Sequence, residues 1–288
     1  MVGPVAHRVV DAAAVAEFDE HGWLLTELLD PATTALLRQW VDDLAAWPDS
    51  PAAWLHYREQ TDSGPKLCRT ENFVPFHAGL RALLTTGVMP EAAGALLGEG
   101  AVLYKEKVNY KLPGGAGYAP HQDAPAYRFV EVHVSCMVAV DDALIDNGCL
   151  EVVSGAHGEL LPTAADGCIR DDVAAELHWS PVQVRAGQTL WFHSRTPHRS
   201  GPNLGSTPRR ALYPTYNAAS EGDLRADYYR QKLAELAAAR ARRWPTSWSR
   251  AATMRSSPAP RASASAADWR AWASWLSSSS YGSSPHAS

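Results

Sequence analysis

Apolar residues recur every three to four positions in several stretches of the chain, as they do on the buried face of an amphipathic helix. In the second of these stretches, Leu37, Val41 and Leu44 lie on one such stripe. Asp30 and Pro31 precede it, and they are a good N-cap residue and a proline suited to the first helical turn. The pattern predicts helices over residues 11–21, 32–46, 80–97 and 223–243, with an interruption of the third around residues 89–90.

Beyond the third predicted helix the pattern changes to short β-rich runs separated by glycine, proline, asparagine and aspartate. Strands follow the helices instead of alternating with them, so a parallel βαβ sheet would lack its crossover helices. The order favours an α+β protein whose core is a double-stranded β-helix, a cupin-like jelly roll, with flanking N-terminal and C-terminal helices. The predicted strands cover residues 101–112, 130–140, 150–153, 182–184, 189–193 and 209–217.

The composition changes after the last predicted helix. The final 33 positions contain twelve serines and few aliphatic side chains, so they cannot bury enough apolar surface to offset the entropy of ordering. Trp269, Trp272 and Trp275 are at helical spacing, which leaves a short docking helix as an alternative. We therefore expect one domain over residues 1–245 and a disordered tail, rich in serine, alanine and arginine, over residues 246–288.

The bulk composition is that of a soluble globular protein, with 46% apolar and 20% charged residues. Four scattered cysteines form no Cys-x-x-Cys pair. The chain does not open on a basic segment followed by an apolar run, and no window approaches the roughly 18 apolar residues of a membrane span. We therefore expect a protein of the reducing cytoplasm that does not enter a membrane.

The net charge of −5 hides an asymmetry between the body and the tail. Residues 240–288 hold seven arginines and one acid, so the first 239 positions carry a charge of −11. A body this acidic repels nucleic acid and anionic membranes. An anionic ligand would have to be bound by a local basic pocket.

Two imidazoles and one carboxylate carry the strongest chemical signal. His121 and Asp123 are two positions apart, and on a strand such positions share a face and can reach one metal. His193 could compete for the third position, but its place within an apolar strand favours a role in the core or in support of the metal ligands. Two histidines and one carboxylate form the facial triad of non-heme Fe(II) oxygenases. The sequence therefore predicts an iron site, the metal triad, made by His121, Asp123 and His198.

An arginine follows the metal triad in the sequence. Arg209 comes eleven residues after His198, and a guanidinium can hold a dicarboxylate co-substrate through a bidentate pair. On a strand only one of Arg209 and Arg210 can face inward, and periodicity does not decide between them. Ser200 could donate a hydroxyl to the same carboxylate, or it could be an ordinary turn residue.

Basic residues form a second pattern. Three of the five lysines of the chain fall on one predicted strand, directly before the metal-binding loop. The ordinary interpretation is a solvated edge strand; the alternative, which we favour, is that at least one lysine lines the pocket and meets an anion. Arg69 is a second anion-binding candidate, with a surface salt bridge as its alternative role. The residues that share this strand face are Lys105, Lys107, Asn109 and Lys111.

The metal triad, taken with Ser200 and Arg209, resembles the phytanoyl-CoA dioxygenase family of Fe(II)- and 2-oxoglutarate-dependent oxygenases. The likeness runs over about residues 15–232. Within that family, residues 104–115 and 119–127 look most like bacterial enzymes that hydroxylate 2-aminoethylphosphonate or its N-trimethyl form.

The resemblance implies a double-stranded β-helix fold, with Fe(II) as cofactor and 2-oxoglutarate as co-substrate. It assigns the carboxylate-binding arginine to Arg209 and places Ser200 beside it. Positions that match Lys105 and Asn109 help to bind 2-oxoglutarate in the family.

The same resemblance implies that O2 and 2-oxoglutarate are used to hydroxylate an unactivated C–H bond, with no catalytic residue beyond the metal centre. For an aminoalkylphosphonate, hydroxylation is expected next to phosphorus. Lys107 and Arg69 remain to bind the phosphonate, while Glu71 or Tyr127 would meet the ammonium group, the latter through cation–π attraction.

Other functions fit parts of the pattern. The same oxygenase chemistry could act on an amino acid, a compatible solute or a natural-product scaffold. A jelly roll could also bind a metal or ligand without catalysis, and two histidines with a carboxylate suit catalytic zinc. Neither of the last two explains Arg209, and release of succinate would separate the oxygenase from both.

Overall fold

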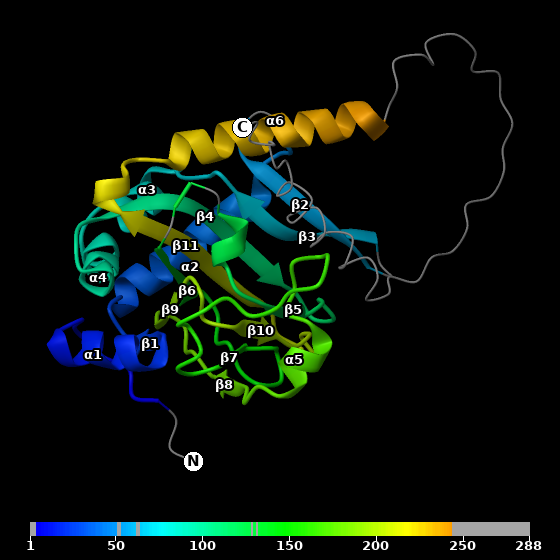
Figure 1. The fold of residues 1–288 in the computed structure, drawn as a ribbon. Helices are drawn as coiled ribbons and strands as arrows, with labels where there is room; N and C mark the ends of the chain where they lie inside the picture. Colours follow the sequence, from blue (N-terminus) through cyan, green and yellow to red (C-terminus); the bar gives the residue numbers. More distant parts are fainter. Residues whose placement is uncertain (1–3, 51–52, 62–63, 128, 131, 244–288) are drawn as a thin grey trace, which may run out of the picture.

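The computed structural model describes residues 4–50, 53–61, 64–127, 129–130 and 132–243 (Figure 1). Our predictions for the tail, residues 246–288, lie outside the described residues. Within them, no helix is long and apolar enough to cross a membrane. The four cysteines all lie among these residues, and none of them forms a disulfide.

Two antiparallel sheets face each other and form the jelly-roll core, as the sequence predicts. The large sheet has the order β1-β9-β6-β11-β4-β3-β2 and the small sheet the order β5-β10-β7-β8. The large sheet contains β1 (Trp23–Thr26), β2 (Leu55–Thr61), β3 (Gly64–Glu71), β4 (Ala101–Lys111), β6 (His133–Ala139), β9 (Thr189–His193) and β11 (Arg209–Ala218). The small sheet contains β5 (Tyr118–His121), β7 (Leu150–Val152), β8 (Ser180–Val182) and β10 (His198–Ser200).

The helices flank the sheets at both ends of the chain. The second begins where its sequence predicts, because the Asp30 side chain accepts a hydrogen bond from Thr33 N at 2.6 Å. The predicted third helix is in fact two helices, and the break falls at residues 86–87 instead of 89–90. The helices are α1 (Ala12–His21), α2 (Pro31–Ala46), α3 (Ala78–Thr85), α4 (Val88–Leu97), α5 (Asp171–Ala175) and α6 (Arg225–Arg243).

Alternation along β6 divides the core into two layers. Val134, Cys136 and Val138 pack against the helices that cover the outer face of the large sheet. Met137 and Ala139 point the other way and pack against the small sheet. Because side chains alternate along a strand, one apolar row of β6 packs under the helices and the other faces the space between the sheets, where the site lies.

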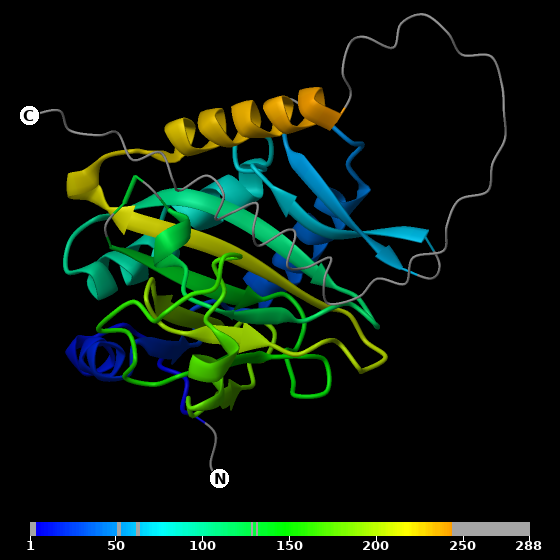
Figure 2. The same cartoon turned by 45° about the vertical axis from the view of Figure 1, so that its right-hand side comes forward.

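The sequence pattern missed several short or polar elements. The strands β1, β2, β3, β5 and β10 and the helix α5 were not predicted, and the strand expected over residues 182–184 is displaced to Ser180–Val182. The β2–β3 hairpin is only partly buried and has no strict alternation of apolar and polar residues. It lies beside α6 at one end of the large sheet (Figure 2), and this placement matters for the site.

Buried polar contacts hold α6 against β4. Arg225 donates from Nε to Glu106 Oε2 at 3.0 Å and from Nη2 to Asn72 Oδ1 at 2.9 Å. One turn later, Tyr229 Oη accepts from Glu106 N at 3.2 Å and donates to Glu106 O at 2.9 Å. Glu106 is fully buried, so its carboxylate needs the positive charge of Arg225 to be stable there.

Replacing Arg225 by methionine is expected to lower the free energy of unfolding by about 3 kcal/mol, because Glu106 would stay buried without its cation. Arg230 of the same helix offers a matched control, since its side chain is 74% exposed and pairs with Asp227 at the surface. Arg230→Met should cost less than about 1 kcal/mol in urea unfolding. Equal losses in the two variants would contradict the anchoring role of Arg225.

Candidate active site

Two neighbouring strands of the small sheet assemble the metal triad. His121 ends β5, His198 begins β10, and the two face each other across the antiparallel pair. Gly117 permits this pairing, because a Cβ there would lie 2.4 Å from Ser200 O of β10. One ligand atom from each of His121, Asp123 and His198 lies within 4.8 Å of the other two. Among the described residues, this is the cluster of His, Cys, Asp and Glu that can hold a metal ion.

Asp123 reaches the triad in a way that differs from our prediction. β5 ends at His121, and Asp123 lies beyond it with helical backbone angles (φ −73°, ψ −31°), before the 3₁₀ turn η1 (Ala124–Ala126). The prediction that both residues share a strand face is therefore wrong. The turn directs the Asp123 carboxylate toward β6, where Ser135 Oγ donates to Oδ2 at 2.8 Å. Oδ1 then lies 3.9 Å from His121 Nε2.

Hydrogen bonds fix the orientation of both imidazoles. His121 Nδ1 donates to Ala119 O at 2.8 Å, and His198 Nδ1 donates to Thr196 O at 3.0 Å. Carbonyl oxygens only accept, so each Nδ1 carries the proton and each Nε2 is left with its lone pair. Histidine ligands of metals are commonly held in this way by the second ring nitrogen.

The protonation states of the triad also suit a divalent metal. Burial, together with the neighbouring His198 ring, lowers the pKa of His121 to about 3, so this imidazole is neutral at pH 7. Burial opposes ionisation of Asp123, but His198, Lys105 and Lys107 outweigh it and hold the pKa of the carboxyl well below its usual range. Two neutral imidazoles and one carboxylate are the forms that bind a metal.

Arg209, and not Arg210, faces the interior. The Arg209 side chain is 1% exposed, and Nη1 lies 3.2 Å from Tyr213 Oη and 3.6 Å from Met137 Sδ. Its Nε and Nη2 have no hydrogen-bond partner, although both are buried. Arg210 points to the opposite face and pairs with Asp141 at 2.8 Å. Two unsatisfied N–H groups on one buried guanidinium match the two oxygens of a carboxylate, so the site fits the distal carboxylate of 2-oxoglutarate.

Lys111 and Ser200 lie beside Arg209. Lys111 faces Arg209 across the β4–β11 pair, and its Nζ donates to Ser200 Oγ at 2.8 Å and to Gly201 O at 2.5 Å. Burial and the charge of Arg209 lower the pKa of Lys111 to about 6. A bound carboxylate would relieve this repulsion. The sequence placed Lys111 on the correct strand face but gave no sign that it meets Ser200.

A cavity opens beside the triad. Lys105, Lys107 and Asn109 line one wall from alternate positions of β4, which confirms that this lysine face is not a solvated edge. Lys105 Nζ lies 4.0 Å from the centre of the Tyr127 ring, and Lys107 Nζ lies 5.3 Å from that of Tyr213. The lining residues that the sequence did not single out for the pocket are Tyr118, Ser135, Leu150, Phe192, Tyr213 and Thr215.

Arg69 and Glu71 lie one strand further from the metal, on β3. Arg69 is buried, so the alternative of a surface salt bridge does not hold. Its Nε donates to Asn109 Oδ1 at 3.0 Å, which couples it to the cavity wall, and its Nη1 lies 3.4 Å from Glu71 Oε1. Glu71 also pairs with Lys232 of α6. Lys232 was not among the predicted site residues.

His193 stands apart from the metal triad, as the sequence predicts, and its side chain is half-buried at the end of β9. Its ring centre lies 5.3 Å from that of His157, and its Nδ1 accepts from Arg195 N at 3.1 Å.

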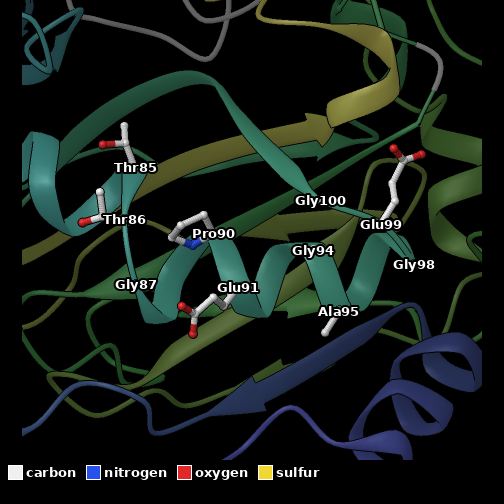
Figure 3. A pocket seen from close by; sticks show the side chains of 10 residues that line it. All are labelled: Thr85, Thr86, Gly87, Pro90, Glu91, Gly94, Ala95, Gly98, Glu99 and Gly100. Carbon is white, nitrogen blue, oxygen red and sulfur yellow. The ribbon is translucent and has the colours of Figure 1, made fainter.

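A second hollow lies along α4, on the helix-covered side of the large sheet (Figure 3). Its charged lining residues are Glu91 and Glu99, and it has no basic side chain. It therefore offers nothing to bind an anionic 2-oxoacid, and the cavity beside the triad is the site.

The facial triad and the buried Arg209 inside a jelly roll define the class of a non-heme iron oxygenase that uses 2-oxoglutarate. The phytanoyl-CoA dioxygenase (PhyH) family matches over residues 18–211, which include the metal triad and Arg209. The protein belongs to this family, and it is a 2-oxoglutarate-dependent dioxygenase of the hydroxylase type.

Two relatives of named activity are similar over most of their length. A methylphosphonate hydroxylase of Gimesia maris is 51% identical over 214 residues, which cover 74% of this chain and 82% of that protein. A 2-aminoethylphosphonate dioxygenase of an uncultured bacterium, HF130_AEPn_1, is 38% identical over 222 residues, which cover 75% of this chain and 85% of that protein.

Solved structures show the same fold at lower sequence identity. EctD from S. alaskensis, determined with 2-oxoglutarate and 5-hydroxyectoine, matches with a TM-score of 0.65 at 21% identity and covers 75% of this chain and 78% of that one. The epimerase SnoN, in complex with Fe3+ and α-ketoglutarate, matches with a TM-score of 0.63 at 23% identity and covers 72% of this chain and 83% of that one. The α+β double-stranded β-helix is therefore the fold of both proteins and of this one.

Proposed function

We propose that the protein hydroxylates the carbon next to phosphorus in a small alkylphosphonate. The observation that carries the proposal is the row of cations beside the metal triad. Lys105 and Lys107 line the cavity, and Arg69 donates a hydrogen bond to the lining residue Asn109, in a chain whose body is strongly acidic. Such a local basic pocket can bind a small anion even though the net negative charge of the protein repels it. Similarity to two phosphonate oxygenases supports the same substrate class.

The geometry and the resemblance to the family support the following assignment of roles. His121, Asp123 and His198 hold Fe(II), and Arg209 binds the distal carboxylate of 2-oxoglutarate. Ser200 supports that carboxylate together with its neighbour on β4. Lys105 and Asn109, which line the cavity, contact the same co-substrate nearer to the metal.

We place the substrate phosphonate against Lys107 and Arg69. Tyr127 covers Lys105 and closes the wall. When bound, iron and 2-oxoglutarate supply the oxidising power: one oxygen atom of O2 enters succinate, with loss of CO2, and the other becomes the substrate hydroxyl. The residues of the chain orient the C–H bond and keep water away from it.

None of the four cysteines, all of which the structure describes, forms a disulfide, and we propose that the enzyme acts in the cytoplasm as a single catalytic domain over residues 1–245.

The test is release of succinate from the enzyme loaded anaerobically with Fe(II) and 2-oxoglutarate and then given O2. The panel contains methylphosphonate, 2-aminoethylphosphonate, its N-trimethyl form, several amino acids and ectoine. Succinate that depends on a phosphonate, with the hydroxylated phosphonate as product, is the expected result. Stimulation by another compound alone would retain the oxygenase and reject the phosphonate.

Replacing Lys107 by methionine is expected to raise the KM for the phosphonate about tenfold to a hundredfold, because a charge-assisted hydrogen bond contributes about 1.5–3 kcal/mol. The KM for 2-oxoglutarate should change little. Lys66→Met serves as the control, since Lys66 lies on β3 outside the cavity lining. A parallel rise of both KM values would instead assign Lys107 to 2-oxoglutarate.

A further inference from the structure

Glu71 is a buried carboxylate on β3, the strand beside the cavity-lining β4, and both of its oxygens contact basic groups. It faces Lys107 across the β3–β4 pair and is 3% exposed. Oε2 pairs with Lys232 Nζ, and Oε1 lies 3.4 Å from Arg69 Nη1. Both oxygens therefore have a cation before any substrate binds.

Lys232 occupies an environment built for a primary ammonium. Its side chain is 11% exposed, and its Nζ lies 5.8 Å from the ring centre of Tyr57 and 5.5 Å from that of Tyr228. The same Nζ donates to Tyr228 Oη at 3.3 Å. A carboxylate combined with aromatic faces is the arrangement by which proteins bind alkylammonium ligands. Here the ammonium group belongs to the protein itself.

The pair is held in place from both sides. α6 is fixed to β4 through Arg225 and Tyr229, and Tyr229 lies one turn before Lys232. Burial opposes ionisation of Glu71, but the charges of Lys232 and Arg69 outweigh it and lower its pKa to about 2. The carboxylate thus remains charged, and its charge is already compensated.

We propose that Lys232 determines substrate specificity by filling the ammonium subsite that Glu71 would otherwise offer, so that the enzyme prefers alkylphosphonates without an amine. This inference rests on the proposed function. A substrate ammonium in the cavity would meet Lys105 and Lys107, while Lys232 already occupies Glu71 and Asp123 belongs to the metal triad. Like charges repel, and such repulsion is a common source of specificity.

The experiment compares 2-aminoethylphosphonate with n-propylphosphonate, its isostere in which a methyl group replaces the ammonium. The measured quantity is the ratio of kcat/KM for the two compounds, since changes in general activity cancel in a ratio. The parent enzyme should prefer n-propylphosphonate. Lys232→Met should shift the ratio at least about tenfold toward 2-aminoethylphosphonate, a change of about 1.4 kcal/mol. Lys232→Arg keeps the cation and should leave the ratio near that of the parent.

A double variant distinguishes two causes of such a shift: the Glu71 carboxylate that Lys232→Met leaves without its lysine, and the space that the smaller side chain leaves. Lys232→Met combined with Glu71→Gln removes both charges, so it should fold and lose the shift toward the amine. A parent enzyme that uses the two compounds equally well would overturn the inference. An unchanged ratio in Lys232→Met, or a shift that persists in the double variant, would overturn it as well.

Anaerobic calorimetric titration of the same compounds distinguishes failure of this inference from failure of the proposed function. It measures binding to the enzyme loaded with Fe(II) and 2-oxoglutarate without turnover. Tighter binding of n-propylphosphonate to the parent, reversed in Lys232→Met, supports the role of Lys232 even if no succinate forms. Binding of neither compound would reject both proposals.

Discussion

Replacing Asp123 by alanine is expected to reduce hydroxylation by at least about a thousandfold, which corresponds to about 4 kcal/mol of transition-state stabilisation. The carboxylate is the single anionic ligand of the triad, and its two histidine partners are neutral. Without it the site would retain two imidazoles, which are too few to hold Fe(II) in one fixed geometry.

The loss should be accompanied by loss of metal binding, and this can be measured without turnover. In the parent, Fe(II) under anaerobic conditions should raise the melting temperature, because a ligand at a hundred times its Kd stabilises the folded state by about 2.7 kcal/mol. In Asp123→Ala this rise should disappear. Asp172→Ala is the control, since Asp172 is an exposed acid paired with Arg170. Full activity in Asp123→Ala would exclude the triad as the iron site.

Replacing Arg209 by methionine is expected to raise the KM for 2-oxoglutarate by about 30-fold or more, because truncating one partner of a buried charged pair costs about 2–5 kcal/mol. The effect should fall on 2-oxoglutarate and not on the phosphonate, because Arg209 is separated from Lys107 along the sheet. Steady-state kinetics with each compound varied in turn gives both constants.

The neighbouring residue supplies a control for the same change of side chain. Arg210→Met should leave the KM for 2-oxoglutarate unchanged but lower the free energy of unfolding by about 1–3 kcal/mol, because it breaks the pair with Asp141. Arg209→Met should not lower it in the absence of 2-oxoglutarate, because the Nε and Nη2 of Arg209 are buried without partners. A loss of stability in Arg209→Met as large as that in Arg210→Met would indicate a structural role.

The contrast between these two arginines shows how a strand sorts adjacent residues. Both are basic and neighbouring in sequence, so composition cannot separate them. The resemblance to the phytanoyl-CoA dioxygenase family chose Arg209, and the structure shows the physical reason. Arg210 is drawn to Asp141 on the outer face, which turns Arg209 between the two sheets.

Patterns that depend on near neighbours were determined by the sequence itself. The cap at Asp30, the alternation along β4 and the apolar stripes of the helices follow from local geometry, and the structure confirms them. The types of the metal ligands were also readable, since two histidines and one carboxylate are chemically distinctive. Local periodicity therefore gave most of the elements and the jelly roll, while the types of residue indicated the iron site.

Only the tertiary structure decided how distant segments complete the site. Asp123 binds from a turn and not from a strand, because Ser135 and the end of β5 set its direction. Lys111 meets Ser200 across 89 positions of sequence, and Lys232 meets Glu71 across 161. Such contacts form because the two sheets and α6 pack together in the folded protein. That packing depends on how side-chain volumes fit and how buried charges are paired across the whole fold, and no local sequence pattern encodes either.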